Sequence, residues 1–315
     1  METVRIPNDA TYSPISLTDM AVAAPILSRL VLGATLPGLI VQTAALTVYA
    51  GSAIQDWLGR LRVKRIDLFA EFGADVYQMA EMPRAVREAE MQALAERLND
   101  GYTTAERPPL EELARIVDRH LTDYIAAITG QRVVTSTEIR TFSLVGLMFP
   151  FALGAADVLS GDVSIFHDAG VIQPHVVAHE FTHRKGYWRE LDAQALAYLS
   201  MAASGDPLLV QSALAERLHR DLRALSGDDE AAYLTSVSSL GLRSELEEEF
   251  KHLRPAIEPW FRPISDAMRS LYDARMRLTG QKGLSDYDVG FTNFLYTFET
   301  STIARQRPPE AGALR

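Results

Sequence analysis

Residues 175–194 read HVVAHEFTHRKGYWRELDAQ, and residues 179–183 within them form an HExxH motif. Two histidines four residues apart project from one face of a helix, close enough to hold one zinc ion. Glu180 lies about 100° around the helix from His179, which places it beside the metal rather than on it. A carboxylate in that position can take a proton from a zinc-activated water. The motif therefore predicts a helix in which His179 and His183 are metal ligands and Glu180 is a general base.

The residues around the motif are those expected of a buried active-site helix. Val177 and Phe181 supply the apolar face that such a helix needs. Pro174 suits a first helical turn, and Gly186 suits the position just after the last one. Upstream, residues 162–166 alternate between apolar and polar side chains, which is typical of a short strand. We therefore expect a strand, a loop and then the HExxH helix.

A third zinc ligand should follow the motif, because a catalytic zinc usually has three protein ligands and an open position. Glu190 is one candidate, since Gly186 can end the first helix and let a second helix bring Glu190 back to the metal. Ala193, one turn further on, leaves room for the two helices to pack closely. Asp192 is the competing candidate, and alternatively it accepts a hydrogen bond from a ligand histidine.

His175 shares a helix face with His179 but cannot complete this site. It lies eight residues before His183, or about 12 Å along the helix axis, so one ion cannot bind all three histidines. Two interpretations of His175 remain: a residue that supports the ligands or faces the substrate, and an ordinary polar residue of the first turn. The other histidines show no ligand spacing: His120, His167, His219 and His252.

A long uncharged stretch precedes this region, and residues 30–54 read LVLGATLPGLIVQTAALTVYAGSAI. As a helix this stretch would extend about 37 Å, more than the roughly 30 Å hydrocarbon core of a bilayer. Residues 20–28 are also mostly apolar and are separated from it by Arg29. We expect one transmembrane helix over about 30–54 with an amphipathic or re-entrant lead-in, rather than a cleavable signal peptide. The alternative is a buried core helix of a soluble protein.

Basic residues flank this stretch unevenly. Arg60, Arg62, Lys64 and Arg65 follow it directly, whereas Arg5 and Arg29 are the only ones that precede its apolar part. By the positive-inside rule, the C-terminal side, and with it the zinc site, is expected to face the cytoplasm.

The composition excludes several classes of function. The 315 residues carry a net charge of −10, which argues against a nucleic-acid-binding surface. The absence of cysteine excludes a disulfide framework, a thiolate metal ligand and a cysteine nucleophile. Hydrophobic residues make up 47% of the chain, enough for a full core and a membrane segment.

The remaining pattern predicts a mostly helical α+β fold with a small sheet packed on the HExxH helix. We divide the chain into an N-terminal segment (1–19), a membrane anchor (20–56), a catalytic domain (57–304) and a disordered tail (305–315). Met268, Tyr272 and Met276 recur every four residues and are expected to form a core-facing stripe. Expected helices span 66–98, 110–128, 191–203, 207–225, 228–252 and 264–279, and expected strands span 133–135, 141–149 and 162–166.

From about residue 66 to about residue 300, the chain resembles an uncharacterised family of bacterial membrane-anchored HExxH proteins regarded as zinc metallopeptidases. The HExxH motif followed by the ExxA turn at 190–193 is also, more distantly, similar to gluzincin peptidases. The resemblance implies a zincin-like fold, with His179, His183 and Glu190 as zinc ligands and Glu180 as general base. The matching pieces are GLMFPF at 146–151, HEFTHRKG at 179–186, RELDA at 189–193, LAYL at 196–199 and SDYDV at 285–289.

The resulting hypothesis is a zinc metalloendopeptidase, anchored by a single span in a bacterial inner membrane, that hydrolyses peptide or protein substrates. Tyr287 is a candidate for hydrogen-bonding the oxyanion, as a Tyr or His commonly does in zinc peptidases, and a tyrosine packed at a helix start is its alternative role. The strand near 162–167 is expected to offer an edge to an extended peptide. Two other functions fit the same residues: a non-catalytic zincin-fold assembly subunit of a membrane complex, and a zinc hydrolase of a non-peptide substrate.

Overall fold

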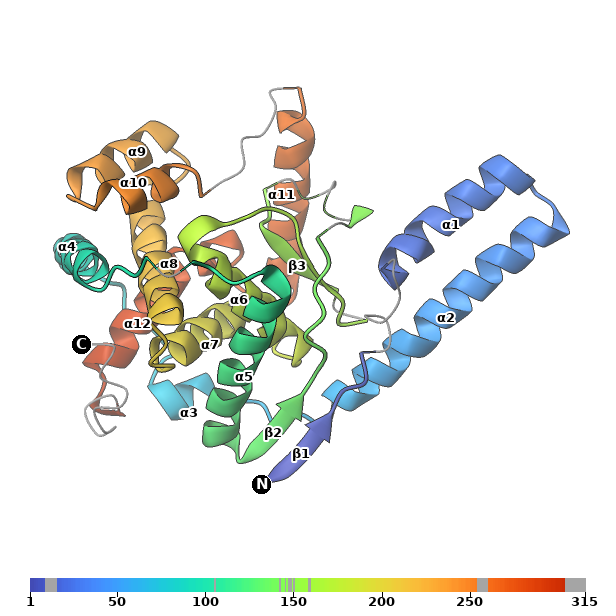
Figure 1. The fold of residues 1–315 in the computed structure, drawn as a ribbon, viewed down its shortest axis with the longest axis horizontal. Coiled ribbons are helices and arrows are strands. Elements are labelled where there is room, and N and C mark those ends of the chain that lie inside the picture. The colour runs from blue at the N-terminus through green and yellow to red at the C-terminus, as the bar shows by residue number, and fades with distance from the viewer. Residues whose placement is uncertain are drawn as a thin grey trace.

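The computed structural model describes residues 1–8, 16–104, 106–141, 143, 144, 146, 149, 151–157, 160–253 and 260–303. The tail expected at 305–315 lies outside these residues. The fold is mostly helical with small sheets, and a helical hairpin projects from one side of a body of packed helices (Figure 1).

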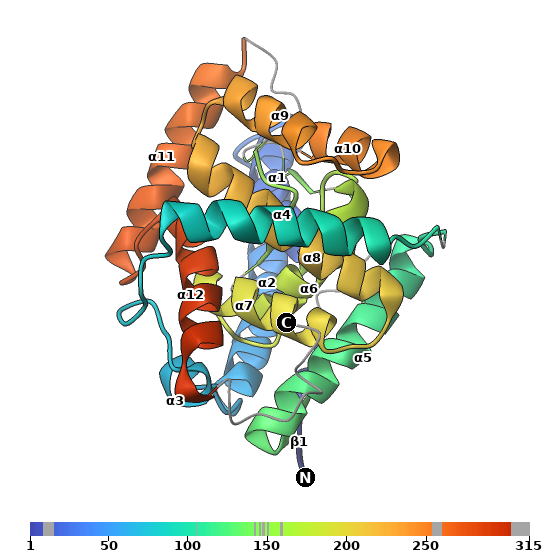
Figure 2. The ribbon, with the colours of Figure 1, turned by 90° about the vertical axis from the view of Figure 1, so that its left-hand side faces the viewer.

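The body is built around the HExxH helix α6 (Gln173–Arg184), which packs against α5 (Leu110–Thr129), α7 (Glu190–Ala202) and α8 (Pro207–Ser226). The helix α4 (Arg84–Asp100) crosses α8 on the side of the body remote from the hairpin (Figure 2). The remaining body helices are α3 (Leu68–Phe72), α9 (Glu230–Ser239), α10 (Ser244–Lys251), α11 (Arg262–Leu278) and α12 (Val289–Thr300).

The strands form two separate pairs rather than one sheet. β1 (Glu2–Arg5) runs parallel to β2 (Gln131–Val134), and β3 (Gly154–Ala156) runs antiparallel to β4 (Val163–Ile165). The β3–β4 pair packs on α6, as expected of the sheet beside the motif. The strand expected at 162–166 is confirmed by β4, whereas the described residues of 141–149 lie in no strand.

Two long helices expected from the sequence are each divided. A single helix was predicted at 66–98, and this prediction is wrong for the residues that connect α3 to α4. Gly73 ends α3 with a left-handed φ of 74°, and Pro83 immediately precedes α4. The helix predicted at 228–252 is divided into α9 and α10 around Gly241, whose φ is 67°. In each case a residue suited to ending a helix outweighs the apolar periodicity on both sides of it.

The uncharged N-terminal stretch forms a helical hairpin rather than one helix. α1 (Leu17–Leu32) and α2 (Leu36–Arg60) pack side by side, and a turn at residues 33–35 connects them at the end remote from the body (Figure 1). Gly33 has a φ of 62°, and the Thr35 hydroxyl caps α2 by accepting from Gly38 N. By length and composition, α2 is able to cross a membrane.

Candidate metal centre and cleft

The turn between α6 and α7 brings the third candidate ligand back to the motif. Pro174 lies in the first turn of α6, and Gly186 follows its last turn with a φ of 102°, as the sequence predicts. The next helix begins at Glu190, so the Glu190 side chain leaves the first turn of α7 towards α6. All three residues, His179, His183 and Glu190, are buried.

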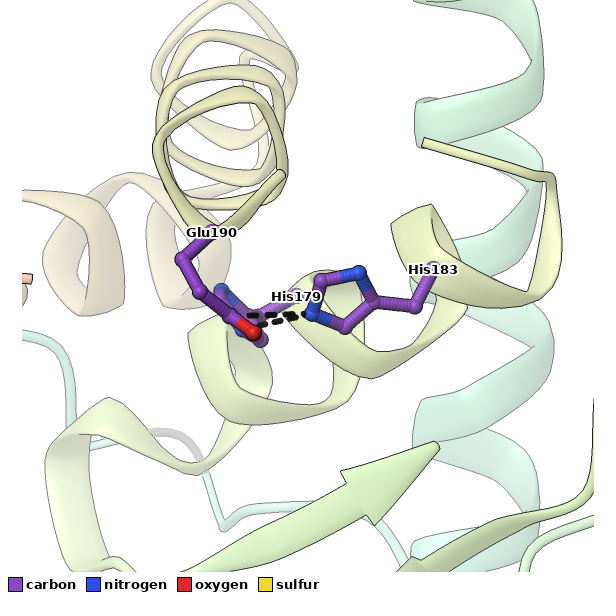
Figure 3. Close-up of side chains that lie close together, drawn as sticks. All are labelled: His179, His183 and Glu190. Atoms are coloured by element: carbon purple, nitrogen blue, oxygen red, sulfur yellow. Dashed lines mark hydrogen bonds and ion pairs between the residues drawn. The ribbon is translucent and has the colours of Figure 1, made fainter. Parts of the chain in front are cut away.

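The three side chains converge on one point (Figure 3). The two Nε2 atoms of His179 and His183 lie 3.1 Å apart, and Glu190 Oε2 lies 3.2 Å from the first and 3.1 Å from the second. In a tetrahedral zinc site with bonds of about 2.0–2.1 Å, ligand atoms lie about 3.3–3.4 Å from one another. The spacing of the three atoms therefore matches one face of such a tetrahedron to within a few tenths of an ångström.

Neighbouring groups orient two of these three side chains. His183 Nδ1 donates to the carbonyl oxygen of Tyr187 at 2.7 Å, which leaves the Nε2 lone pair available to a metal. The Tyr272 hydroxyl donates to Glu190 Oε1 at 2.7 Å, so that only Oε2 faces the histidines. The backbone N–H of Glu190 donates to Gln281 Oε1 at 2.8 Å, which fixes the start of α7.

The charge of the cluster also suits a cation. Burial opposes ionisation of Glu190, but the adjacent His183 and His179 hold its pKa well below its ordinary value. A buried carboxylate is thus kept ionised beside two imidazole nitrogens. These residues could hold a divalent metal ion, and the donor set alone does not distinguish zinc from other transition metals.

Glu180 lies beside this cluster and not in it. Its side chain is buried and lines the same cavity, and burial raises its pKa despite the opposing effect of His179 and His183. Gly154 of β3 packs closely against it, since a Cβ atom at that position would lie 3.2 Å from Glu180 Cγ. Because position 154 has no side chain, the Glu180 side chain can occupy this space without a steric clash.

A cavity of about 610 Å³ opens over the cluster. Its walls include His179, Glu180, His183 and Glu190, together with a large apolar surface. Phe149 packs edge-on against both Phe151 and Tyr272, and these three rings form part of the wall. A cavity of this size, apolar with a few convergent polar groups, is typical of a ligand-binding site.

Tyr287 lies next to the cluster of His179, His183 and Glu190. Its ring is 5.8 Å from the ring of His179, and the guanidinium carbon of Arg220 is 5.7 Å from its centroid. Burial, the charge of Glu190 and hydrogen bonds with Glu190 and Tyr272 raise the pKa of the Tyr287 hydroxyl well above its ordinary value. The hydroxyl is therefore a protonated hydrogen-bond donor beside the candidate ligands.

Asp192 and His175 lie outside the cluster. For His183, the hydrogen-bond acceptor that we considered as an alternative role of Asp192 is the Tyr187 carbonyl oxygen. Burial raises the pKa of the Asp192 carboxyl to about 6. His175 is buried in the cavity wall with Nε2 3.6 Å from Glu216 Oε1, and burial lowers its pKa to about 4.

The strand edge that faces the cavity belongs to β3 and not to β4. β4 is paired with β3 on one side, and Arg140 forms a parallel bridge with Ser164 on the other, which corrects our expectation for 162–167. Alternation in an antiparallel pair turns the backbone N–H and C=O groups of Gly154 and Ala156 away from β4. Within the described part of the chain, these groups form no backbone hydrogen bond, and both residues line the cavity.

Sequence reasoning missed several residues that position the site. Tyr272 belongs to the stripe assigned to the core, and its hydroxyl contacts Glu190 instead. Arg184, fully buried, donates to the carbonyl oxygens of Ser136, Glu138 and Gly161 at 2.7–2.8 Å. Lys185, also fully buried, lies 2.6 Å from Asp118 Oδ1. The available signal was the presence of two basic residues, Arg184 and Lys185, directly after the HExxH motif, because such side chains can bond the end of this helix to neighbouring segments.

Comparison with known proteins places the matched region over the body. A family model matches residues 76–296, more than two thirds of the chain, and this region contains every candidate site residue. No curated protein and no solved structure matches the chain. The chain therefore belongs to the family described as "Protein of unknown function (DUF3810)".

Proposed function

We propose that this protein is a membrane-anchored zinc metallopeptidase with a zincin-like active site. The observation that carries the proposal is the convergence of His179, His183 and Glu190 at 3.1–3.2 Å with Glu180 beside them in an apolar cavity. Two imidazoles and one carboxylate form a ligand set used by catalytic zinc. Bound there, Zn²⁺ would lower the pKa of a water molecule and polarise the scissile carbonyl.

Glu180 has the position and the environment of a general base. It is next to the cluster in sequence and in space, and its side chain faces the cavity. Burial raises its pKa, which makes the carboxylate a better proton acceptor than one in water. We assign it two roles: it accepts a proton from the attacking water, and it passes that proton to the leaving nitrogen.

The cavity-facing edge of β3, which forms no backbone hydrogen bond with the described residues, and the apolar walls suit an extended peptide. Gly154 and Ala156 turn backbone donors and acceptors away from β4, and a peptide strand can pair with such groups. Phe149 and Phe151 offer apolar contact area to its side chains. Tyr287 supplies a hydroxyl donor beside the cluster for the oxyanion that develops on the scissile carbonyl. This array of backbone groups favours a peptide over a substrate without amide groups.

The first test measures metal content and hydrolysis together on detergent-purified protein. We expect about one zinc per chain in the wild type, loss of zinc in His183→Ala, and retained zinc with hydrolysis reduced by 10³-fold or more in Glu180→Gln, since the general base is lost. Cleavage would be followed with a library of quenched fluorescent peptides.

Two variants control for general damage. His252→Ala removes an exposed histidine, and Asp192→Asn removes a carboxylate outside the cluster, so both should keep zinc and activity. Wild-type protein that takes up no zinc after reconstitution would overturn the proposal in favour of a structural subunit. Full hydrolysis by Glu180→Gln would overturn the role of Glu180.

A further inference from the structure

The two ends of the α1–α2 hairpin are both held by the body. At the α2 end, the Asn8 backbone N–H donates to Asp56 Oδ1 at 2.8 Å, and Asn8 Oδ1 accepts from the Ser136 N–H at 3.0 Å. At the α1 end, Asp19 Oδ1 accepts from Ser143 Oγ at 3.0 Å and from the Leu144 N–H at 2.8 Å. The turn at 33–35 is therefore the free end.

The strand that precedes the hairpin is part of the body as well. β1 pairs in register with β2, from Glu2 opposite Gln131 to Arg5 opposite Val134, and the Ile6 N–H continues the ladder to the Val134 carbonyl at 3.0 Å. Val4 and Ile6 are buried in the core. Residues 2–6 consequently lie on the same side of any membrane as the HExxH helix.

The outer surface of the hairpin is apolar over most of its length. Between residues 20 and 55, Arg29 is the single charged residue. Large apolar side chains on both helices are more than half exposed: Leu30, Val31, Leu36, Leu39, Ile40 and Val48. A contiguous exposed apolar surface of this kind in water is unfavourable and indicates a partner that covers it.

The contacts between the two helices resemble those that hold helices together in lipid. Gln42 Nε2 donates to Ser28 Oγ at 2.7 Å across the pair. Gly38 allows close approach, because a Cβ atom there would lie 3.0 Å from the Gly33 carbonyl oxygen. Small residues and polar side-chain hydrogen bonds stabilise helix pairs where burial of apolar side chains cannot. Gln42 and Ser28 thus form a polar contact between the two helices, while large apolar side chains face outward.

We propose that the hairpin inserts tip first into the lipid bilayer, and that the chain returns to the side from which it entered. A single crossing by α2 would place Thr3 and the HExxH domain on opposite sides, which the β1–β2 pairing prevents. Moreover, α1 has 16 residues and is about 24 Å long, shorter than the roughly 30 Å hydrocarbon core. The inference replaces a single-pass anchor and rests on the proposed membrane attachment, not on zinc or hydrolysis.

The base of the hairpin carries the residues expected at a membrane surface. Trp57 is 48% exposed near the end of α2, and the exposed Arg62 and Lys64 follow. Tryptophan is enriched at the membrane interface, and basic residues on the cytoplasmic side. Exposed Arg5 precedes Ile6, which lies against Gly59 at the end of α2, so the basic residues before and after the hairpin lie on one side of it. By the positive-inside rule, we place that side in the cytoplasm.

The absence of cysteine allows a direct test in the full chain. Single cysteines would be introduced at exposed positions in β1 (Thr3→Cys), at the tip (Ala34→Cys) and in the body (Asp100→Cys). A membrane-impermeant maleimide would then be applied to membrane vesicles of each orientation. We expect Thr3→Cys and Asp100→Cys to react from the same side, and Ala34→Cys to be shielded from that side.

Each outcome of the labelling experiment supports or overturns a specific part of the proposal. Reaction of Thr3→Cys and Asp100→Cys from opposite sides would overturn the hairpin topology and leave membrane attachment intact. Reaction of membrane-bound Ala34→Cys from the side of the body would show that the tip is not inserted. Recovery of the wild type as a soluble dimer would show that a second copy of the chain, and not lipid, covers the apolar surface of the hairpin. That result would also overturn the membrane anchor. None of these readouts depends on zinc, so a failed peptidase assay is a separate result.

A charge variant gives an independent measurement. Ile40→Glu places a carboxylate on the exposed apolar surface near the tip, whereas Val86→Glu places one at an exposed apolar position on α4. We expect at least a 10-fold rise in the fraction released by alkaline carbonate for Ile40→Glu, since charged residues are costly in hydrocarbon, and no rise for Val86→Glu. Equal release of the two variants would contradict insertion of the tip.

Discussion

The hydroxyl of Tyr272 donates a hydrogen bond to Oε1 of Glu190 at 2.7 Å, and this contact divides the two carboxylate oxygens between different tasks. Oε2 alone faces His179 and His183, at 3.2 and 3.1 Å. Tyr272, 82 positions further along the chain, therefore orients the Glu190 carboxylate relative to the two histidines. Groups that orient metal ligands in this way affect affinity although they do not touch the metal.

Replacement of Tyr272 with phenylalanine should weaken metal binding. Without the hydroxyl, Glu190 Oε1 loses its donor at 2.7 Å and the carboxylate is held less firmly, so we expect zinc affinity to fall about 10- to 100-fold. Competition with a chromophoric chelator would measure the affinity. Tyr102→Phe, which changes a tyrosine in the loop before α5, is the matched control and should bind zinc as the wild type does. Equal affinity in both variants would contradict the orienting role.

Replacement of Tyr287 with phenylalanine should lower turnover and spare the metal. The ring stays beside His179, whereas its hydroxyl, the proposed donor to the oxyanion, is lost. Removing one such donor typically reduces kcat by about 10²–10³-fold. Steady-state kinetics with a cleaved peptide, together with zinc analysis, would separate this effect from loss of metal. Unchanged kcat would leave Tyr287 as a packing residue only.

Adding a side chain at Gly154 should disturb Glu180. A Cβ atom there would lie 3.0 Å from Ile165 Cδ1 and 3.2 Å from Glu180 Cγ, so a neighbour has to move. Displacement of a catalytic group by about 1 Å can cost about 100-fold in rate. We expect Gly154→Val to lose about that much kcat and to keep its zinc. Gly51→Ala, where the added Cβ meets open space, should have no effect on kcat.

How far the sequence determines this site depends on distance along the chain. The positions of His179, Glu180 and His183 follow from helix geometry, and Pro174 and Gly186 mark the helix ends through their backbone preferences. The contact of Tyr272 with Glu190 depends on how α11 packs, and no local pattern encodes it. β3 reads Gly-Ala-Ala and has no strand pattern of its own, so its pairing with β4 defines it.

The same limit applies to the N-terminal region. The length and composition of residues 30–54 indicate a membrane segment, and one helix of the structure is long and apolar enough to cross a membrane. Gly33 and Thr35 are local signals for the turn, but they lie within a continuous uncharged stretch that by itself predicts one helix. The pairing of β1 with β2 joins residues about 130 positions apart, and only tertiary structure reveals it.

The buried pair of Lys185 and Asp118 should matter for stability. Its two side chains are 0% and 15% exposed, and Lys185→Met would leave the Asp118 carboxylate without its cation. Breaking a buried pair costs about 3–5 kcal/mol, and we expect about 3 kcal/mol because Asp118 keeps some contact with water. Denaturant unfolding in detergent would measure the loss. Lys251→Met, which breaks a surface pair with Glu247, should cost no more than about 1 kcal/mol.

Acid should destabilise the protein in part through Glu216. Burial opposes ionisation of Glu216, but Arg220, His175 and His219 outweigh it and hold the pKa well below the ordinary 4.5. A carboxyl group whose pKa is lower in the folded state adds stability above pH 4.5 that is lost as the pH falls. Glu216→Gln should therefore be less stable at pH 7 and should lose less stability than the wild type below pH 4.5.

Unfolding curves at pH 7, 5, 4 and 3 would test this expectation, because the wild-type and Glu216→Gln stabilities should converge as the pH falls. Glu248→Gln, which changes an exposed glutamate, should follow the wild type throughout. Parallel curves for the wild type and Glu216→Gln would show that Glu216 does not titrate with folding.

Ser16, whose hydroxyl caps α1, is also part of the cavity wall. The residue at the start of the hairpin is thus shared with the cleft, and α1 extends from it for about 24 Å. If the hairpin inserts as proposed, a bilayer that is too thin or too thick for it would tilt it, and the tilt would move the cleft wall at Ser16. If the protein is the proposed peptidase, its turnover in bilayers of graded acyl-chain length should therefore pass through an optimum, and membrane thickness would regulate its activity.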